Sequence, residues 1–134
     1  IKMDISLFTL QTHGDERGSL VALEEFENIP FSVKRVYYMF ETLANVVRGG
    51  HAHKRLRQVV IAVRGSCRFS LDDGSERIEL LLDNPKQALL IEPMIYHEMY
   101  DFSEDCVLLA LANELFDEDD YIRSYEQFKL LVSV

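Results

Sequence analysis

The chain has 134 residues, which is the size of one ordinary domain and is enough for a buried core. Apolar residues make up 48% and charged residues 28%, a balance typical of soluble globular proteins and not of disordered or collagen-like chains. The formal net charge of −9 argues against nucleic-acid binding through a large basic surface. No apolar run approaches the roughly 18 residues of a membrane span. We therefore expect a cytoplasmic protein with no membrane partner.

The N-terminal part of the sequence predicts short strands separated by turns. Apolar alternation at Ile5 and Leu7 marks the first strand, and Pro30 interrupts the second. The clearest strand is the third, in which both faces carry apolar side chains and are expected to be at least partly covered. The three strands are expected over residues 1–10, 19–25 and 31–40.

The C-terminal part continues this pattern and ends in a helix. The pair Asp73-Gly74 lies between two extended runs, which is a strong hairpin signal. Helical periodicity is convincing only near the end, where Ile122 and Tyr125 fit a short amphipathic helix that begins around Asp119. Many short strands at intervals of about 8 to 12 residues favour an antiparallel sandwich or barrel, here one domain over residues 1–134. The further strands are expected over residues 59–63, 67–71, 76–82, 88–91 and 106–112.

The two cysteines, Cys67 and Cys106, lie in apolar strand-like runs without the spacing of a metal or redox motif. We expect both to be buried free thiols, which behave as small apolar side chains. They carry little information about function.

The most informative segment is residues 48–53, Arg-Gly-Gly-His-Ala-His. Side chains alternate between the two faces of a strand, so His51 and His53 are expected to point into one pocket. That pocket could hold a metal, transfer protons or be a packed core. Basic residues gather around this segment, and in an acidic protein such a group could bind a compact anion or could line a solvated strand edge. They are Arg48, Lys54, Arg55, Arg57, Arg64 and Arg68.

The order of residues after this segment resembles the two signature motifs of the cupins. These proteins have a mainly β fold, the double-stranded β-helix or jelly-roll barrel, which we expect here with a short C-terminal helix. The first motif matches in spacing, whereas the second lacks the usual glycine between its proline and histidine. The matching positions are Gly49, Gly50, His51, His53, Gln58 and Gly65, followed by Pro93 and His97.

Metal-binding cupins hold their ion with three histidines and a glutamate, whose position is taken here by Gln58. A neutral amide is a poorer ligand than a carboxylate and brings no charge to a divalent ion. We therefore expect no metal and no cofactor. Two imidazoles without a metal can still transfer protons near neutral pH.

Nearly the whole chain shows a closer resemblance, to the dTDP-4-keto-6-deoxyglucose 3,4-ketoisomerases. These are metal-independent cupins of bacterial deoxysugar biosynthesis, which supplies deoxyamino sugars to O-antigen or S-layer glycans. The tail motif Asp-Tyr-Ile-Arg-Ser-Tyr is not a general cupin feature, so it makes the match more specific. The segments that carry the resemblance are residues 17–22, 34–38, 48–54, 65–68, 72–74, 96–98 and 120–125.

The resemblance implies a sugar-nucleotide ketoisomerase that moves a ketone from C4 to C3 of the sugar through an enediol. His51 is then the base that takes the C3 proton and returns it to C4, and His53 assists transfer between the two oxygens. Tyr37 is the expected hydroxyl partner of the enediol oxygens. Histidine suits both steps because its ordinary pKa lies near working pH. The stereochemistry at C4 of the product, gluco or galacto, stays open.

The same resemblance implies residues that bind the rest of the dTDP-linked substrate. Arg17 and Arg48 are the candidates for the diphosphate, and His97 either contacts substrate or only shapes the pocket. Tyr121 and Arg123, with Tyr125, are expected to pack the terminal helix on the barrel. A homodimer is implied, in which each subunit adds a strand to its partner.

Two other classes of function remain open from the residues alone. One is a metal-dependent cupin oxygenase or isomerase. The other is a non-catalytic cupin that binds a sugar.

Overall fold

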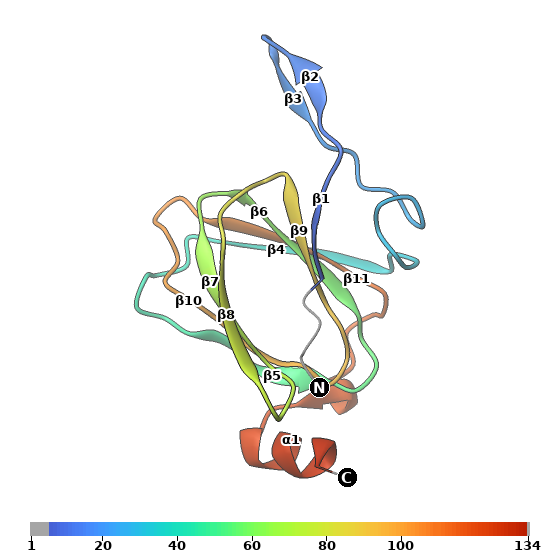
Figure 1. The fold of residues 1–134 in the computed structure, drawn as a ribbon, viewed down its shortest axis with the longest axis vertical. Coiled ribbons are helices and arrows are strands. Elements are labelled where there is room, and N and C mark those ends of the chain that lie inside the picture. Colours follow the sequence, from blue (N-terminus) through green and yellow to red (C-terminus); the bar gives the residue numbers. More distant parts are fainter. Residues whose placement is uncertain (1–5, 134) are drawn as a thin grey trace.

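Two five-stranded antiparallel sheets face each other and form a barrel (Figure 1). The computed structural model describes residues 6–133. One sheet has the strand order β1-β9-β6-β11-β4 and the other β12-β5-β10-β7-β8, so strands distant in sequence lie side by side. The mainly β jelly-roll barrel with a short C-terminal helix, expected from the sequence, is confirmed.

The elements are bounded as follows. The strands are β1 Ser6–Thr9, β2 His13–Asp15, β3 Gly18–Leu20, β4 Arg35–Phe40, β5 Arg48–His53, β6 Gln58–Arg64, β7 Cys67–Asp72, β8 Arg77–Leu82, β9 Gln87–Ile91, β10 Tyr96–Tyr100, β11 Val107–Ala112 and β12 Tyr121–Ile122. A 3₁₀ helix covers Glu118–Asp120, and the α-helix α1 covers Tyr125–Val132.

Turn chemistry explains the hairpin between β7 and β8. Gly74 has φ of +98°, a region that favours glycine, and its N–H donates to the Asp72 carboxylate at 2.7 Å. Asp73 accepts from two further backbone N–H groups, so the turn satisfies its own polar groups. The predicted hairpin is confirmed.

The core fills the space between the sheets and extends over the back of the first one. Apolar runs such as β6 are buried on both faces, which explains why they read as continuous and not as alternating. Cys67 and Cys106 are buried free thiols within this core, as expected. The larger cluster contains Val60, Ala62, Cys67, Phe69, Leu71, Leu82, Leu89, Ile91, Met99, Phe102, Cys106, Leu108 and Ala110.

The expected strand over residues 31–40 is too long at its start. The strand begins at Arg35, because Phe31 instead turns into the second apolar cluster and is only 4% exposed. Its outer face is also less covered than expected. Val36, Tyr38 and Phe40 are 56%, 63% and 57% exposed, on a strand that ends its sheet.

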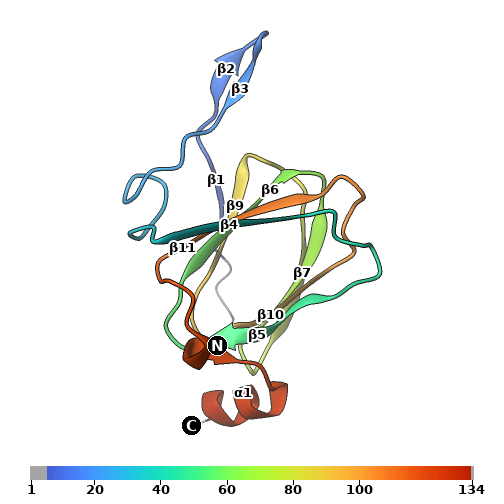
Figure 2. The same cartoon turned by 180° about the vertical axis from the view of Figure 1, so that it is seen from behind.

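The first expected strand is confirmed as β1 in the part of the chain that the structure describes. Its inward side chain is Phe8, followed by Leu10 just beyond the strand, whereas Leu7 is 40% exposed; Ile5 lies outside the described residues. The expected strand over residues 19–25 stops at Leu20, because it pairs only with β2. β2 and β3 form a separate hairpin that extends away from the barrel, at the end opposite α1 (Figures 1 and 2).

The terminal helix begins later than expected. Asp117 caps the 3₁₀ helix, β12 follows, and only then does Ser124 cap α1 by accepting from the Gln127 N–H. Phe128 is the fully buried residue of α1, and its ring packs 5.6 Å from that of Tyr96. None of the helices within residues 6–133 combines the length and the apolar composition needed to span a membrane.

The docking of α1 gives a stability prediction. Replacing Phe128 by alanine should lower the free energy of unfolding by about 3 kcal/mol, because it leaves a cavity at a fully buried site. Urea unfolding followed by circular dichroism measures it. Leu130→Ala is the matched control on the same helix, where a side chain that is 71% exposed should cost less than about 0.5 kcal/mol. Equal losses in the two variants would contradict the observed docking.

Candidate active site

Three neighbouring strands of the second sheet bring the histidines together. β5 pairs with β10 so that His51 lies opposite His97, and β12 pairs with β5 so that Tyr121 lies opposite His53. The ring of His51 lies 4.8 Å from that of His53 and 4.7 Å from that of His97, centroid to centroid. His51 and His53 therefore share one face of the strand, as their spacing predicts.

Two glycines let β5 approach β10 so closely. Gly49 and Gly50 have φ of +84° and +75°, a conformation that side chains disfavour. A Cβ at Gly49 would also meet the His97 backbone oxygen at 2.9 Å. The pairing of the two strands is irregular just here, between His97 and Glu98. The Gly-Gly pair thus sets the position from which His51 enters the site.

The first sheet supplies the opposite wall of the cavity. Arg35, Tyr37 and Met39 alternate along β4 and face the histidines of the other sheet. The cavity between them has a volume of about 250 Å³. It is lined by Arg35, Tyr37, Met39, Arg48, Gly49, His51, His97, Met99 and Tyr121. His53 does not line it and is only 4% exposed.

The three imidazoles are held in their neutral form. Burial, and next the neighbouring His53, lower the pKa of His51 to about 4. Burial and His97 lower the pKa of His53 to about 4, and burial and His51 do the same for His97. Each ring therefore carries a single N–H proton at neutral pH and can accept a second one on its other nitrogen.

Tyr37 is also neutral. Burial raises the pKa of its hydroxyl to about 12, although the nearby charge of Arg35 acts in the opposite direction. Tyr37 is thus available as a hydroxyl group and not as a phenolate.

Two arginines keep their charge free for a ligand. Within residues 6–133, Arg35 and Arg48 have no carboxylate partner, and both line the cavity. The Nε of Arg35 is buried without a hydrogen-bond partner. Such unpaired guanidinium groups suit an anionic ligand. The other arginines in this part of the chain each form an ion pair; they are Arg17, Arg55, Arg57, Arg64, Arg68, Arg77 and Arg123.

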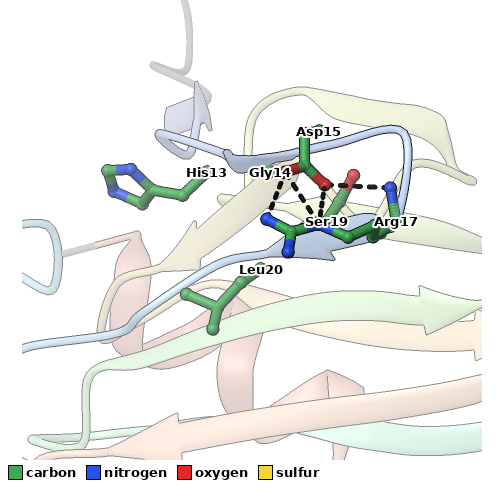
Figure 3. Close-up of a pocket in the computed structure, with 7 residues that line it drawn as sticks. His13, Gly14, Asp15, Arg17, Ser19 and Leu20 are labelled. Atoms are coloured by element: carbon green, nitrogen blue, oxygen red, sulfur yellow. Dashed lines mark hydrogen bonds and ion pairs between the residues drawn. The ribbon is translucent and has the colours of Figure 1, made fainter.

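Arg17 lies outside this cavity. It is at the tip of the β2–β3 hairpin, its side chain is 85% exposed, and it pairs with Asp15 at 2.6 Å (Figure 3). Because the hairpin extends away from the barrel, one chain does not bring Arg17 to its own histidines (Figures 1 and 2). Its predicted role in diphosphate binding stays a prediction.

The histidine cluster could accept a divalent ion, because ligand nitrogens of His51, His53 and His97 all lie within 4.8 Å of one another. The donor set does not match the three-histidine-one-glutamate site of metal cupins. Gln58 takes the fourth position as a neutral amide, and its oxygen already accepts a hydrogen bond from Tyr37. We derive no step through a metal.

Sequence reasoning missed two residues of the site. Tyr121 does not pack α1 on the barrel as expected: its ring lies 4.5 Å from His53 and 4.8 Å from His51. The pairing of β12 with β5 places it there, and nothing local in the sequence indicates that pairing. Arg35 could have been found, because it lies two residues before Tyr37 on the same face of its strand. Tyr125 does pack as expected, by donating to Asp72 at 2.7 Å.

Comparison with known proteins agrees with this geometry. The model of the family "FdtA: WxcM-like, C-terminal" matches residues 3–133. A TDP-4-oxo-6-deoxy-alpha-D-glucose-3,4-oxoisomerase from Aneurinibacillus thermoaerophilus is 54% identical over 119 residues, which cover 89% of this chain and 86% of that protein.

Solved structures give the same assignment. A 3,4-ketoisomerase from Helicobacter canadensis is 40% identical with a TM-score of 0.95, covering 99% of this chain and 100% of that one. A histidine-to-asparagine variant of a 3,4-ketoisomerase from Thermoanaerobacterium thermosaccharolyticum, in complex with TDP-4-keto-6-deoxyglucose, is 37% identical with a TM-score of 0.95. That match covers 99% of this chain and 96% of the other. This chain therefore belongs to the FdtA, WxcM-like C-terminal family, together with the sugar 3,4-ketoisomerases.

Proposed function

We propose that this chain is a cytoplasmic enzyme that converts TDP-4-keto-6-deoxyglucose into a TDP-3-keto-6-deoxyhexose. The observation that carries the proposal is a neutral His51 in a cavity that also contains Tyr37 and two unpaired arginines. A relative that is 54% identical over 89% of the chain bears the corresponding name, and a related enzyme was solved with this sugar nucleotide.

The chemistry needs one group that first removes and then returns a proton. Neutral His51 takes the proton from C3, the C3–H electron pair forms the C3=C4 double bond, and the C4 carbonyl oxygen gains a proton. The resulting enediol then loses the proton of its C3 oxygen, so that overall one proton passes from the C3 oxygen to the C4 oxygen. The C3–oxygen double bond forms, and the electron pair of the C3=C4 bond takes the proton that His51 returns to C4. Histidine fits because the same ring is base in the first step and acid in the second.

Tyr37 and His53 have supporting parts in this proposal. Tyr37 lines the cavity, and in this proposal its hydroxyl group is the partner of the enediol oxygens at C3 and C4. His53 lies behind His51, so its assistance in transferring protons between these oxygens stays a prediction. His97 forms part of the wall that the sugar meets.

We assign the diphosphate to Arg35 and Arg48. Both guanidinium groups lie at the cavity without a carboxylate among residues 6–133, so binding an anion does not require them to leave another partner. Charge-assisted hydrogen bonds to phosphate oxygens are among the strong ones in proteins.

We further propose that the enzyme is a homodimer in which the β2–β3 hairpin of each subunit reaches the site of the other. The exposed apolar row of Val36, Tyr38 and Phe40 on the last strand of a sheet is the kind of surface that partners cover. The hairpin extends from the barrel with Arg17 at its tip (Figure 1). Arg17 would then bind diphosphate in the partner's site.

The first prediction concerns His51. His51→Asn should lower kcat by between about 10²- and 10⁴-fold, because it removes the acid–base group, while TDP binding measured by calorimetry is retained. Proton NMR of the product formed by the unchanged protein identifies the reaction and the stereochemistry at C4. Near-normal turnover by the variant would exclude His51 as the base. Binding of the sugar nucleotide without any product, and without solvent deuterium at C3, would contradict the enzymatic proposal.

The second prediction concerns pH. Since the pKa of His51 is lowered to about 4, kcat/KM should stay level as pH falls from about 8 to about 5 and decline only as the ring protonates near 4. A decline centred near 6.5 would show an unshifted histidine. The unfolded chain binds more protons than the folded one between pH 6.5 and about 4. The free energy of unfolding therefore also decreases as pH is lowered through that window. Circular dichroism at each pH is the control that the enzyme remains folded.

The third prediction tests the shared site. Arg17→Ala alone should lower kcat/KM by about 10- to 100-fold, the range expected for losing a charged hydrogen bond. A hybrid dimer, purified through two different tags, combines an Arg17→Ala subunit with a His51→Asn subunit. It should regain about half of the activity of the unchanged dimer, because one of its two sites is intact. An inactive hybrid, or failure to recover any hybrid, would contradict the proposal.

A further inference from the structure

Gln58 forms a chain of hydrogen bonds between the two walls of the cavity. Its side chain is 2% exposed at the start of β6. The Tyr37 hydroxyl lies 2.7 Å from its Oε1, and its Nε2 lies 3.4 Å from Nε2 of His97. The other ring nitrogen of His97, Nδ1, lies 3.2 Å from the backbone oxygen of Ile95.

The carbonyl of Ile95 fixes the donor-to-acceptor direction of all these hydrogen bonds. A carbonyl only accepts hydrogen bonds, so the proton of a neutral His97 ring must be on Nδ1. Nε2 is then an acceptor and must face the amide NH₂ of Gln58. This leaves Oε1 of Gln58 toward Tyr37, whose O–H donates to it. Reversing any one bond would bring two acceptors or two donors face to face.

The neutral state that this reasoning needs fits the surroundings of His97. The ring is 2% exposed, and burial lowers its pKa to about 4. The nearest titratable groups are also uncharged, since the same effect acts on His51 and the hydroxyl of Tyr37 has its pKa raised to about 12.

We propose that Gln58 and His97 are positioning residues that turn the hydroxyl proton of Tyr37 away from the cavity, so that Tyr37 meets the substrate as a hydrogen-bond acceptor. The role toward substrate rests on the proposed function. In the starting 4-keto sugar C3 carries a hydroxyl group, which can donate a hydrogen bond to an acceptor. Tyr37 thereby orients the C3 hydroxyl that must later become the ketone.

This assignment explains why an amide suits position 58. A carboxylate would accept at both ends and would call for a proton on Nε2 of His97. The ring would then have either a bare Nδ1 against the Ile95 carbonyl or a second proton and a positive charge. An apolar side chain would leave both neighbours unsatisfied in a buried place, which is costly. Only an amide donates at one end and accepts at the other.

The decisive experiment is the tautomer of His97, measured in the substrate-free, full-length protein by long-range ¹H–¹⁵N NMR, with the signals assigned by their loss in His97→Asn. We expect the proton on Nδ1 and a bare Nε2. A proton on Nε2 would overturn the proposal, because the amide would then have to face the other way and the Tyr37 proton would point into the cavity. This readout does not depend on activity, so it separates failure of the inference from failure of the proposed function.

A double-mutant cycle tests whether Gln58 acts through Tyr37. Gln58→Met and Tyr37→Phe should each lower kcat/KM by about tenfold or more. The double variant should lose little beyond Tyr37→Phe alone, since the partner through which Gln58 acts is already gone. Additive losses would show that Gln58 acts on its own and would overturn the positioning role. Should Gln58→Met fail to fold, the tautomer measurement still decides the direction of the chain.

Discussion

The whole site depends on the close pairing of β5 with β10. It places His51 opposite His97 and, through the two-residue period of a strand, brings His53 to the same face. The three imidazole rings lie so close together that a positive charge on one disfavours protonation of its neighbours. Their burial disfavours the protonated form further. The close approach that Gly49 permits thus favours a neutral base at His51, although the charge of Glu118 acts in the opposite direction.

The electrostatics of the chain separate two tasks that one cavity must perform. A proton-transfer base has to be neutral when substrate binds, whereas a diphosphate needs positive charge. Carboxylates neutralise the other arginines within residues 6–133, but leave Arg35 and Arg48 unpaired at the cavity. Burial and His97 are the main causes of the lowered pKa of His53, and the charge of Arg35 lowers that pKa further. Arg35, one of the two arginines that suit the anion, therefore also helps to keep His53 uncharged.

The sequence predicts those parts of the fold that depend on interactions between residues close together in the chain. The Asp73-Gly74 hairpin and the shared face of His51 and His53 follow from turn geometry and strand period. Long-range pairing does not follow in this way. The helical spacing of Ile122 and Tyr125 predicts a helix from around Asp119 that would include Tyr121, but its pairing with β5 makes Tyr121 a strand residue beside the histidines. The position of Arg17 likewise depends on the β2–β3 hairpin, which extends away from the barrel and which local turn chemistry alone does not orient (Figures 1 and 2).

Gln58 affects both metal binding and the hydrogen bonds of the site. It stands where metal-binding cupins have a glutamate, so the three histidines have no neighbouring carboxylate ligand at this position. Its contacts show that an amide is also what Tyr37 and His97 require, because one end must accept and the other must donate. The two arguments have the same physical origin. A carboxylate would bring negative charge to the histidines and would reverse the hydrogen bonds, whereas the amide keeps the rings neutral and gives the chain a single direction.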